Sequence, residues 1–507
     1  MQLNNIFKFN GGVQPEENKT LSTGLPIAKL PIPKKLILPL RQHVGQVAKL
    51  KVKPGDKVLK GQMIAEADGS ISAAIHAPTS GKVIKISEEI IPHPSGLPDF
   101  CITIEPDFKD TWIEKKPISW KKMDRTQLIE AFTKSGIVGL GGAVFPAHMK
   151  LKIRQTQPIN TLVINAAECE PFITCDDILM RERADEIIQG ALITQTILEA
   201  KKCIVGIENN KIEACEALKK AAQKTSIEIK VVPTLYPSGD AKRLIYLLMG
   251  IETPNDKRSS DLGIQVFNVA TVAAIYRYLE LGEPSINRIV TITGAVKTPQ
   301  NFEVLFGTPL SDLINAAGGS STKQKKFIMG GPMMGFDLPS IHVPVTKAMN
   351  CVIESSPELF PDPKPVMPCI RCARCADACP VNLQPQELYW FSKSSQLEKA
   401  REYNLFDCIE CGCCSYVCPS NIPLVQFYRY AKSEIIAQDK SKEAANTARE
   451  RNEFRLARIE REKKERAERH AQKALGAQDK EAQDEKKSTI AAAMERVKQN
   501  QQENIKN

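Results

Sequence analysis

The sequence contains no long apolar segment. Over its 507 residues, no apolar run approaches the ~20 residues that a membrane-spanning helix needs. Its first residues, MQLNNIFKFNGG, lack the apolar stretch that a secretory signal requires. We therefore expect any membrane association of this chain to be peripheral.

The sequence also lacks the composition of a nucleic-acid-binding or a disulfide-rich protein. The net charge of +10 is modest and lies largely in the C-terminal tail, so it does not indicate nucleic acid as a partner. Of the 15 cysteines, seven are scattered without the regular framework of a small secreted scaffold, which favours a reducing cytosol. Hydrophobic residues make up 42% and charged residues 25%, so a chain of this length should form several globular domains.

Cysteine at a fixed spacing is the strongest pattern that is present. Residues 369–380 read CIRCARCADACP and residues 408–419 read CIECGCCSYVCP, so each follows C-x₂-C-x₂-C-x₃-C-P. This spacing is typical of two-cluster ferredoxins, in which three cysteines wrap one [4Fe–4S] cluster and the fourth binds the other cluster. A zinc site or a disulfide framework is the alternative, but neither is typically built from eight cysteines in this rhythm. We assign the metal ligands as Cys369, Cys372, Cys375 and Cys418 for one cluster, and Cys408, Cys411, Cys414 and Cys379 for the other.

The segments around these motifs have simpler patterns. Apolar residues at helical spacing between the motifs predict one or two helices, and Cys413, which lies off the ligand pattern, is interpreted as a bystander thiol. The proline-rich stretch 357–368 predicts an extended linker that leads into the clusters. After a predicted helix from Leu424, the chain beyond about residue 440 mixes charges of both signs with few apolar residues, which indicates a solvated helix or disorder.

Short strands joined by tight turns are expected between residues 37 and 104. Alternating apolar residues are interrupted by Pro54-Gly55-Asp56 and by Lys60-Gly61. This region resembles the biotinyl/lipoyl-type barrel-sandwich fold. The hairpin tip that carries a modified lysine in carrier members of that family reads ADGS at residues 67–70 here, so we expect no carrier function.

Helices and strands alternate from about residue 124 to residue 280, which predicts an α/β domain with a mostly parallel sheet. Two of its loops have a composition suited to ligand binding. Glycines at 136, 139, 141 and 142 permit close backbone approach to a phosphate, and Lys150 could add a charge. Asn165, Glu168 and Glu170 follow a predicted strand, where α/β folds commonly bind ligands. A polar turn with a helix cap is the alternative interpretation.

Together, these loops resemble the flavin- and NADH-binding subunit family of respiratory complex I. The matching segments are GLGGAVFPAHMK, NAAECEP, YPSGDAK and NVAT. The resemblance implies that Glu168 and Glu170 lie near the isoalloxazine and NAD(H). It also implies a set of FMN contacts: Gly139, Gly141, Gly142, Lys150, Asn165, Asn268 and Thr271. Two positions depart from the family pattern, because its glycine before Phe-Pro is Val144 and its aspartate before the first glutamate is Ala167.

Residues 288–319 resemble an SLBB domain, a β-grasp module that we interpret as structural, with a helix expected over Leu310–Ala317. The expected fold class is therefore multidomain α/β and α+β. The expected domains are a barrel-sandwich domain (1–110), an FMN/NADH-binding Rossmann-like α/β domain (120–282), an SLBB domain (286–345), an α-helical two-cluster ferredoxin domain (357–435) and a charged tail (436–507).

This order of domains resembles the RnfC/RsxC family, the nucleotide-facing subunits of Rnf electron-transport complexes. The resemblance implies electron transfer between NAD(H) and ferredoxin through FMN and two [4Fe–4S] clusters, coupled to ion translocation by partner subunits. It implies that the partners are the other subunits of a membrane-bound complex and a ferredoxin-like carrier, with the chain peripheral on the cytoplasmic face of the inner membrane. The alternative is an iron–sulfur relay or docking subunit that binds neither nucleotide nor flavin, which the departures at Val144 and Ala167 favour.

Overall fold

The computed structural model describes residues 6–152, 157–254, 256–322 and 326–503. The chain divides into two compact units, Met1–Tyr430 and Ala431–Asn507, which are described separately. Among the described residues, no helix combines the length and the apolar character needed to cross a bilayer. The domain families anticipated above account for the folds observed along the chain.

The first domain contains two small antiparallel sheets. A four-stranded sheet has the order β2-β8-β7-β4, and a three-stranded sheet has the order β3-β5-β6. Apolar side chains from both sheets share one core, which includes Leu38, Ile64 and Ile102. The residues 67–70 lie in the connection between β5 and β6, as expected for a hairpin tip. The bounds are β2 Leu36–Pro39, β3 Lys49–Leu50, β4 Lys57–Val58, β5 Met63–Glu66, β6 Ile75–His76, β7 Gly81–Ile90 and β8 Pro98–Pro106.

The second domain is built on a four-stranded parallel sheet with the order β11-β10-β9-β12. Its strands are short apolar runs because helices cover both faces, as expected for α/β architecture. Helices α4 and α7 pack closely because Gly190 has no side chain: a Cβ there would lie 2.0 Å from the carbonyl oxygen of Val272. The strands are β9 Thr161–Ala166, β10 Lys202–Glu208, β11 Glu228–Val232 and β12 Ile264–Asn268. The helices are α1 Arg125–Ser135, α2 Ala147–Leu151, α3 Cys175–Glu182, α4 Ala184–Ile197, α5 Ile212–Ala222, α6 Ala241–Met249 and α7 Val269–Leu281.

The third domain is a mixed six-stranded sheet with the order β1-β14-β13-β17-β15-β16 and the helix α8. Its edge strand β1 comes from the N-terminal segment and pairs in parallel with β14, a long-range pairing that sequence patterns did not predict. The N-terminal segment therefore contributes to a domain that is otherwise formed from residue 287 onward. The bounds are β1 Ala28–Lys29, β13 Asn287–Gly294, β14 Gln300–Leu305, α8 Leu310–Ala316, β15 Phe327–Met329, β16 Phe336–Asp337 and β17 Cys351–Glu354.

Short helices carry the cysteine motifs. Two helices occupy the spacer between the motifs, in agreement with the sequence prediction. Residues 361–373, which include most of the proline-rich stretch, form neither helix nor strand. The bounds are α9 Arg374–Asp377, α10 Pro385–Lys393, α11 Leu397–Glu402 and α12 Cys413–Tyr416. Within the described residues, 3₁₀ turns span Lys19–Leu21, Trp120–Lys122, Ser259–Leu262 and Leu405–Asp407.

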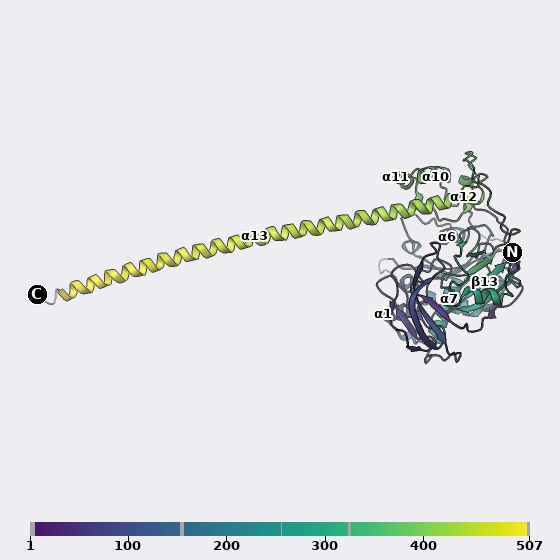
Figure 1. Ribbon diagram of the computed structural model, residues 1–507, viewed down its shortest axis with the longest axis horizontal. Helices are drawn as coiled ribbons and strands as arrows, with labels where there is room; N and C mark the ends of the chain where they lie inside the picture. The colour runs from purple at the N-terminus through teal and green to yellow at the C-terminus, as the bar shows by residue number, and fades with distance from the viewer. Residues whose placement is uncertain (1–5, 153–156, 255, 323–325, 504–507) are drawn as a thin grey trace. The chain divides into compact units, whose positions relative to one another are not determined.

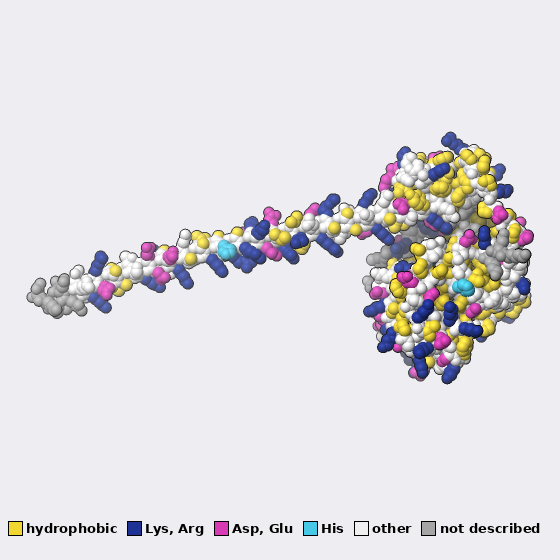
Figure 2. Space-filling view, viewed as in Figure 1, with side chains coloured by type: hydrophobic (Ala, Val, Ile, Leu, Met, Phe, Trp, Pro, Cys, Tyr) yellow, Lys and Arg dark blue, Asp and Glu magenta, His cyan; other side chains and the backbone are white. Residues whose placement is uncertain are grey.

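The second unit is helical. Helix α13 runs without interruption from Leu424 to Glu503 (Figure 1). Of the two alternatives for the tail, a solvated helix is therefore observed. Lys and Arg alternate with Asp and Glu along it (Figure 2), and pairs such as Arg458–Glu462 and Glu465–Arg469 lie one turn apart. Such pairs and the abundance of Ala, Glu, Lys, Arg and Gln favour a helix without a hydrophobic core.

Candidate functional site

One half of the cysteines assigned as metal ligands lines a single pocket. The first cysteine set (Cys369, Cys372, Cys375 and Cys418) combines three thiols of the first motif with the last thiol of the second, and all four line this pocket. The fourth cysteine of each motif was expected to reach across to the other cluster. The observed arrangement is the one that such cross-ligation needs.

The second cysteine set (Cys408, Cys411, Cys414 and Cys379) is also clustered. Burial, followed by the charges of Cys408, Cys411 and Cys379, raises the pKa of Cys414 well above its ordinary value. Backbone N–H groups point at two of these sulfurs, from Leu383 to Cys379 Sγ (3.3 Å) and from Glu410 to Cys408 Sγ (3.4 Å). Hydrogen bonds of this kind tune the reduction potential of iron–sulfur clusters.

The two motifs form an internal repeat with an offset of 39 residues, which relates 369 to 408 and 379 to 418. The backbone repeats as well. Arg371 and Ala373 have positive φ, as do their counterparts Glu410 and Gly412, and the short helices α9 and α12 begin at equivalent positions. This left-handed backbone between the cysteines lets three consecutive thiols turn toward one centre.

Tyr428 lies close to both cysteine sets. It is buried, and its hydroxyl donates a hydrogen bond of 2.6 Å to the carbonyl oxygen of Pro385. Burial raises its pKa, and so do charges on Cys414, Cys408 and Cys379 of the second set and on Cys375 of the first. The two candidate clusters are therefore neighbours.

The glycine-rich loop forms a closed turn with an open tip. Gly139 N donates to Phe145 O at 2.8 Å, and this contact closes the turn. At the tip, Gly142 has a φ of +115°, and no atom lies within 4 Å of the position that a Cβ would take. Val144 has a φ of +41°, so the valine adopts the backbone conformation that favours glycine. The substitution of the family's glycine therefore leaves the turn intact.

The parallel sheet brings three of the predicted FMN contacts to this loop. Asn165 on β9 and Asn268 on β12 are direct partners in the register of the two strands, at their carboxyl ends. Thr271, in the first turn of α7, accepts a hydrogen bond from the backbone N–H of Leu140 at 2.9 Å. Gly141 lies against the Asn268 side chain, 3.3 Å from it at the Cβ position. The turn is thus held beside the strand ends.

Lys150 approaches the same strand ends from α2. Its Nζ donates one hydrogen bond, to Val266 O at 3.1 Å, and lies 5.3 Å from the centre of the Phe267 ring. Burial lowers its pKa, and within the described part of the chain no carboxylate pairs with it. An unpaired, partly buried ammonium beside an open glycine turn suits an anionic group such as a phosphate. Helix α2 has only five residues, so its own N-terminus would add little.

The two predicted acids lie in the loop after β9, where their carboxylates already bind backbone N–H groups. Glu168 is buried and accepts hydrogen bonds from Asp176 N (2.8 Å) and Asp177 N (3.3 Å), which caps α3. Glu170 accepts from Met333 N (2.7 Å) and Met334 N (3.1 Å), in the glycine-rich turn 330–335. This turn was interpreted as a plain turn, but it contacts a predicted site residue. Burial raises the pKa of Glu168 to about 8 and also raises that of Glu170.

Replacing Glu168 with glutamine should flatten the pH dependence of thermal stability. The folded carboxyl keeps its proton up to about pH 8, whereas the unfolded one loses it near 4.5. Since the folded state binds the extra proton, this residue's contribution is complete below about pH 4.5 and is lost as the pH rises through about 8. Melting temperatures between pH 5 and 8, compared with those of the surface variant Glu216→Gln, test this. Parallel profiles of wild type and Glu168→Gln would contradict it.

Lys19 is a buried residue of this site that sequence reasoning missed. Its Nζ donates to the carbonyl oxygens of Glu168 (2.7 Å), Glu170 (2.9 Å) and Ile173 (2.6 Å). Lys19 therefore fixes the backbone of the acid-bearing loop from the N-terminal segment. No sequence signal could have placed it, because the contacts join residues about 150 positions apart.

The second cysteine set contacts the α/β domain. The hydroxyl of Tyr236 donates to Cys411 O at 2.6 Å, and a Cβ on Gly412 would lie 2.7 Å from Met333 O. Met333 is also the residue whose N–H binds Glu170. In contrast, Cys372 of the first set is exposed, and the adjacent Ile370 is 67% exposed. The second set is thus joined to the predicted flavin site, while the first set reaches the surface.

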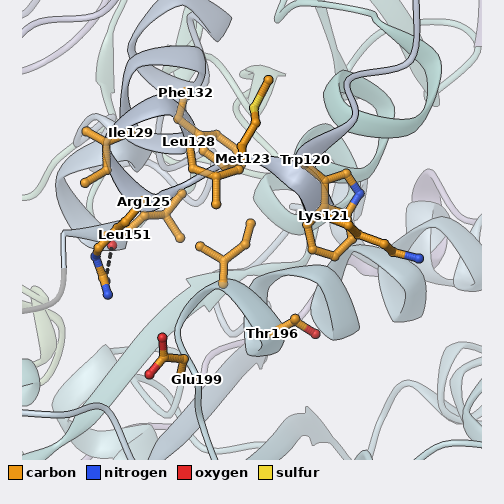
Figure 3. A pocket seen from close by; sticks show the side chains of 11 residues that line it. Trp120, Lys121, Met123, Arg125, Leu128, Ile129, Phe132, Leu151, Thr196 and Glu199 are labelled. Atoms are coloured by element: carbon orange, nitrogen blue, oxygen red, sulfur yellow. Dashed lines mark hydrogen bonds between the residues drawn. The ribbon is translucent and has the colours of Figure 1, made fainter.

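A separate pocket lies between α1 and the end of α4 (Figure 3). Trp120, Met123, Leu128 and Phe132 give it an apolar lining, and Arg125 donates to Leu151 O at its edge. None of the predicted site residues lines this pocket. It has no evident part in cofactor binding.

Four families match successive parts of the chain. The RnfC barrel sandwich hybrid domain matches residues 7–109, the Nuo51 FMN-binding domain residues 132–277, the SLBB domain residues 289–337 and the 4Fe-4S dicluster domain residues 368–422. The chain therefore contains an FMN-binding domain and a domain for two iron–sulfur clusters. The open glycine turn with Lys150 and the two cysteine sets are suited to hold these groups.

Curated relatives match nearly the whole chain. Proteins described as subunits of an ion-translocating oxidoreductase complex are 46% identical in Serratia proteamaculans (97% of this chain, 70% of the relative), Yersinia pestis bv. Antiqua (98% and 79%) and Vibrio cholerae (97% and 64%). Each relative is longer than this chain. Among solved structures, an NAD⁺-reducing [NiFe]-hydrogenase aligns with 62% of this chain and 61% of its own at 18% identity and a TM-score of 0.42, a similarity too low to indicate function.

Proposed function

This chain belongs to the RnfC family of ion-translocating oxidoreductase subunits, and on that premise we propose that it passes electrons between NAD(H) and a ferredoxin-like carrier through FMN and two [4Fe–4S] clusters. Partner subunits of a membrane-bound complex would couple this transfer to ion translocation. The chain would be peripheral, on the cytoplasmic face of the membrane. The observation that carries the proposal is the contact of the second cysteine set with the α/β domain, through Tyr236 and Cys411.

Bound FMN can exchange two electrons with NAD(H) and one electron at a time with clusters, which is the conversion that this function needs. The residues of the chain would bind and orient the group. The open tip at Gly141 and Gly142, with Lys150 beside it, would receive the phosphate. Asn165 and Asn268 would offer amide groups from the strand ends. Glu170, held by the 330–335 turn, would lie near the nicotinamide side.

The two cysteine sets would have different tasks. The second set would exchange electrons with the flavin side, because its loop is bonded to Tyr236 and packed on Met333. The first set would exchange electrons with the partner carrier, because Cys372 and the side chains around it are exposed. Tyr428, which lies near both sets, would occupy the space between the two clusters.

Addition of NADH to anaerobically purified, FMN-loaded protein tests the proposal. We expect flavin absorbance near its visible maximum to bleach and the cluster absorbance to fall after it. If the protein holds flavin and the flavin stays oxidised, the dehydrogenase role is wrong. If the purified protein holds iron and sulfide but neither retains nor binds FMN, the alternative of a relay subunit without nucleotide chemistry replaces the proposal.

A further inference from the structure

Two buried cationic side chains from the third domain bind the glycine-rich loop of the second domain. Lys347, between α8 and β17, is fully buried, and its Nζ donates to Gly136 O (2.6 Å) and Ala74 O (2.9 Å). Burial lowers the pKa of Lys347 to about 7, and no carboxylate of the described residues pairs with it. Both the ammonium and the neutral amine supply the two N–H donors that these carbonyls need.

Arg288, on β13, binds the same loop four residues further on. Its Nη2 donates to Leu140 O at 3.0 Å, its Nε donates to Ile289 O at 3.2 Å, and its Nη1 donates to Lys347 O. The guanidinium is buried, so all three bonds are shielded from water. Arg288 thereby joins the loop at Leu140 to the backbone of the residue that holds it at Gly136.

The close approach depends on glycine at position 136. Its φ is +70°, and a Cβ there would lie 2.6 Å from Ala74 O and 3.2 Å from Lys347 Nζ. The first glycine of the loop therefore serves contact with Lys347 and the barrel-sandwich domain. The glycines at 141 and 142 remain at the exposed tip.

We propose that Arg288 and Lys347 are positioning residues that hold the glycine-rich loop in the shape that receives FMN, so that the SLBB module has a role beyond scaffolding. This inference rests on the proposed function in taking this loop as the FMN site. A loop with four glycines over seven residues has many accessible conformations, and fixing it opposes binding unless the fold has already done so. Lys347 fixes the loop before the turn, and Arg288 fixes it immediately before the tip.

The test compares Lys347→Met with Arg183→Met in the full chain. Methionine keeps an unbranched stem and removes both donors. Arg183 also joins the second domain to the third, through Glu303 at 2.6 Å, but binds no atom of the glycine-rich loop. We expect Lys347→Met to weaken FMN binding about tenfold, measured by quenching of flavin fluorescence, with iron content unchanged. Arg183→Met should lower the melting temperature and leave FMN affinity as in wild type.

Hydrogen exchange of the FMN-free proteins provides a readout that does not depend on flavin. Amides of residues 137–147 should exchange at least tenfold faster in Lys347→Met than in wild type or Arg183→Met. Wild-type exchange in this loop together with wild-type FMN affinity would overturn the inference. If wild type itself binds no FMN, the proposed function fails, and the exchange rates alone decide whether the residues hold the loop.

Arg288→Lys serves if Lys347→Met does not fold. The lysine keeps the charge but cannot reach Leu140 O and Lys347 O together, since it lacks the planar fork of the guanidinium. We expect the same direction of change in both readouts. Unchanged loop exchange and unchanged FMN affinity in a folded Arg288→Lys protein would also overturn the inference.

Discussion

Replacing Cys379 with alanine should remove the cluster of the second cysteine set, although Cys379 belongs to the first motif. In the structure, Cys379 lies with Cys408, Cys411 and Cys414, while Cys418 of the second motif lies with the first set. Iron in anaerobically purified protein should fall from about eight to about four atoms per chain. Low-temperature EPR of the reduced protein should show one cluster without its magnetic neighbour.

Cys413→Ala is the matched control. Cys413 lies inside the second motif and is buried, but it is outside both cysteine sets, so the variant should keep about eight irons. To show which cluster remains, Cys379→Ala can be combined with Cys372→Ala in the first set. Residual iron of about four in this double variant would mean that the assignment of ligands to the two clusters is wrong.

Replacing Lys150 with methionine should weaken FMN binding by about 10- to 100-fold. Hydrogen bonds to charged groups contribute about 1.5–3 kcal/mol, and each 1.4 kcal/mol corresponds to a factor of ten in affinity. The effect should be large because no carboxylate among the described residues neutralises Lys150 and its only protein acceptor there is Val266 O. The dissociation constant can be measured by titrating flavin-free protein with FMN and following the quenching of fluorescence.

Two comparisons make this result specific. Lys152→Met removes an exposed charge two residues away and should leave the affinity unchanged. Riboflavin, which lacks the phosphate, should bind wild type and Lys150→Met equally. If Lys150→Met lowers riboflavin and FMN affinity by the same factor, Lys150 acts on the loop and not on the phosphate.

The loss of FMN affinity expected for Lys150→Met differs in kind from that expected for Lys347→Met. Lys150 would contact the ligand, so its loss should leave the exchange of loop amides unchanged. Lys347 would act through the loop, so its loss should change both. Measuring affinity and exchange on the two variants separates a binding residue from a positioning residue.

Sequence patterns were sufficient wherever the physical cause is local. The cysteine spacing fixes which thiols can reach one centre, and the parallel sheet follows from short apolar runs that alternate with helices. Apolar residues at helical spacing also predicted the two spacer helices, and the mixed charges of the tail suited a solvated helix. Val144 shows the limit of a single-residue argument, because its positive φ preserves a turn that the missing glycine seemed to weaken.

The sequence by itself determined the cluster ligands, the order of the domains and the residues that could hold FMN, since each depends on spacing along a short stretch. Only the tertiary structure decided what supports them. Lys19, Tyr236, Arg288 and Lys347 bind backbone carbonyls 148 to 273 positions away from them, except for the shorter bonds that Arg288 makes near itself. A carbonyl oxygen is the same at every residue, so no pattern of side chains along the chain can indicate which one a buried cation or hydroxyl will find.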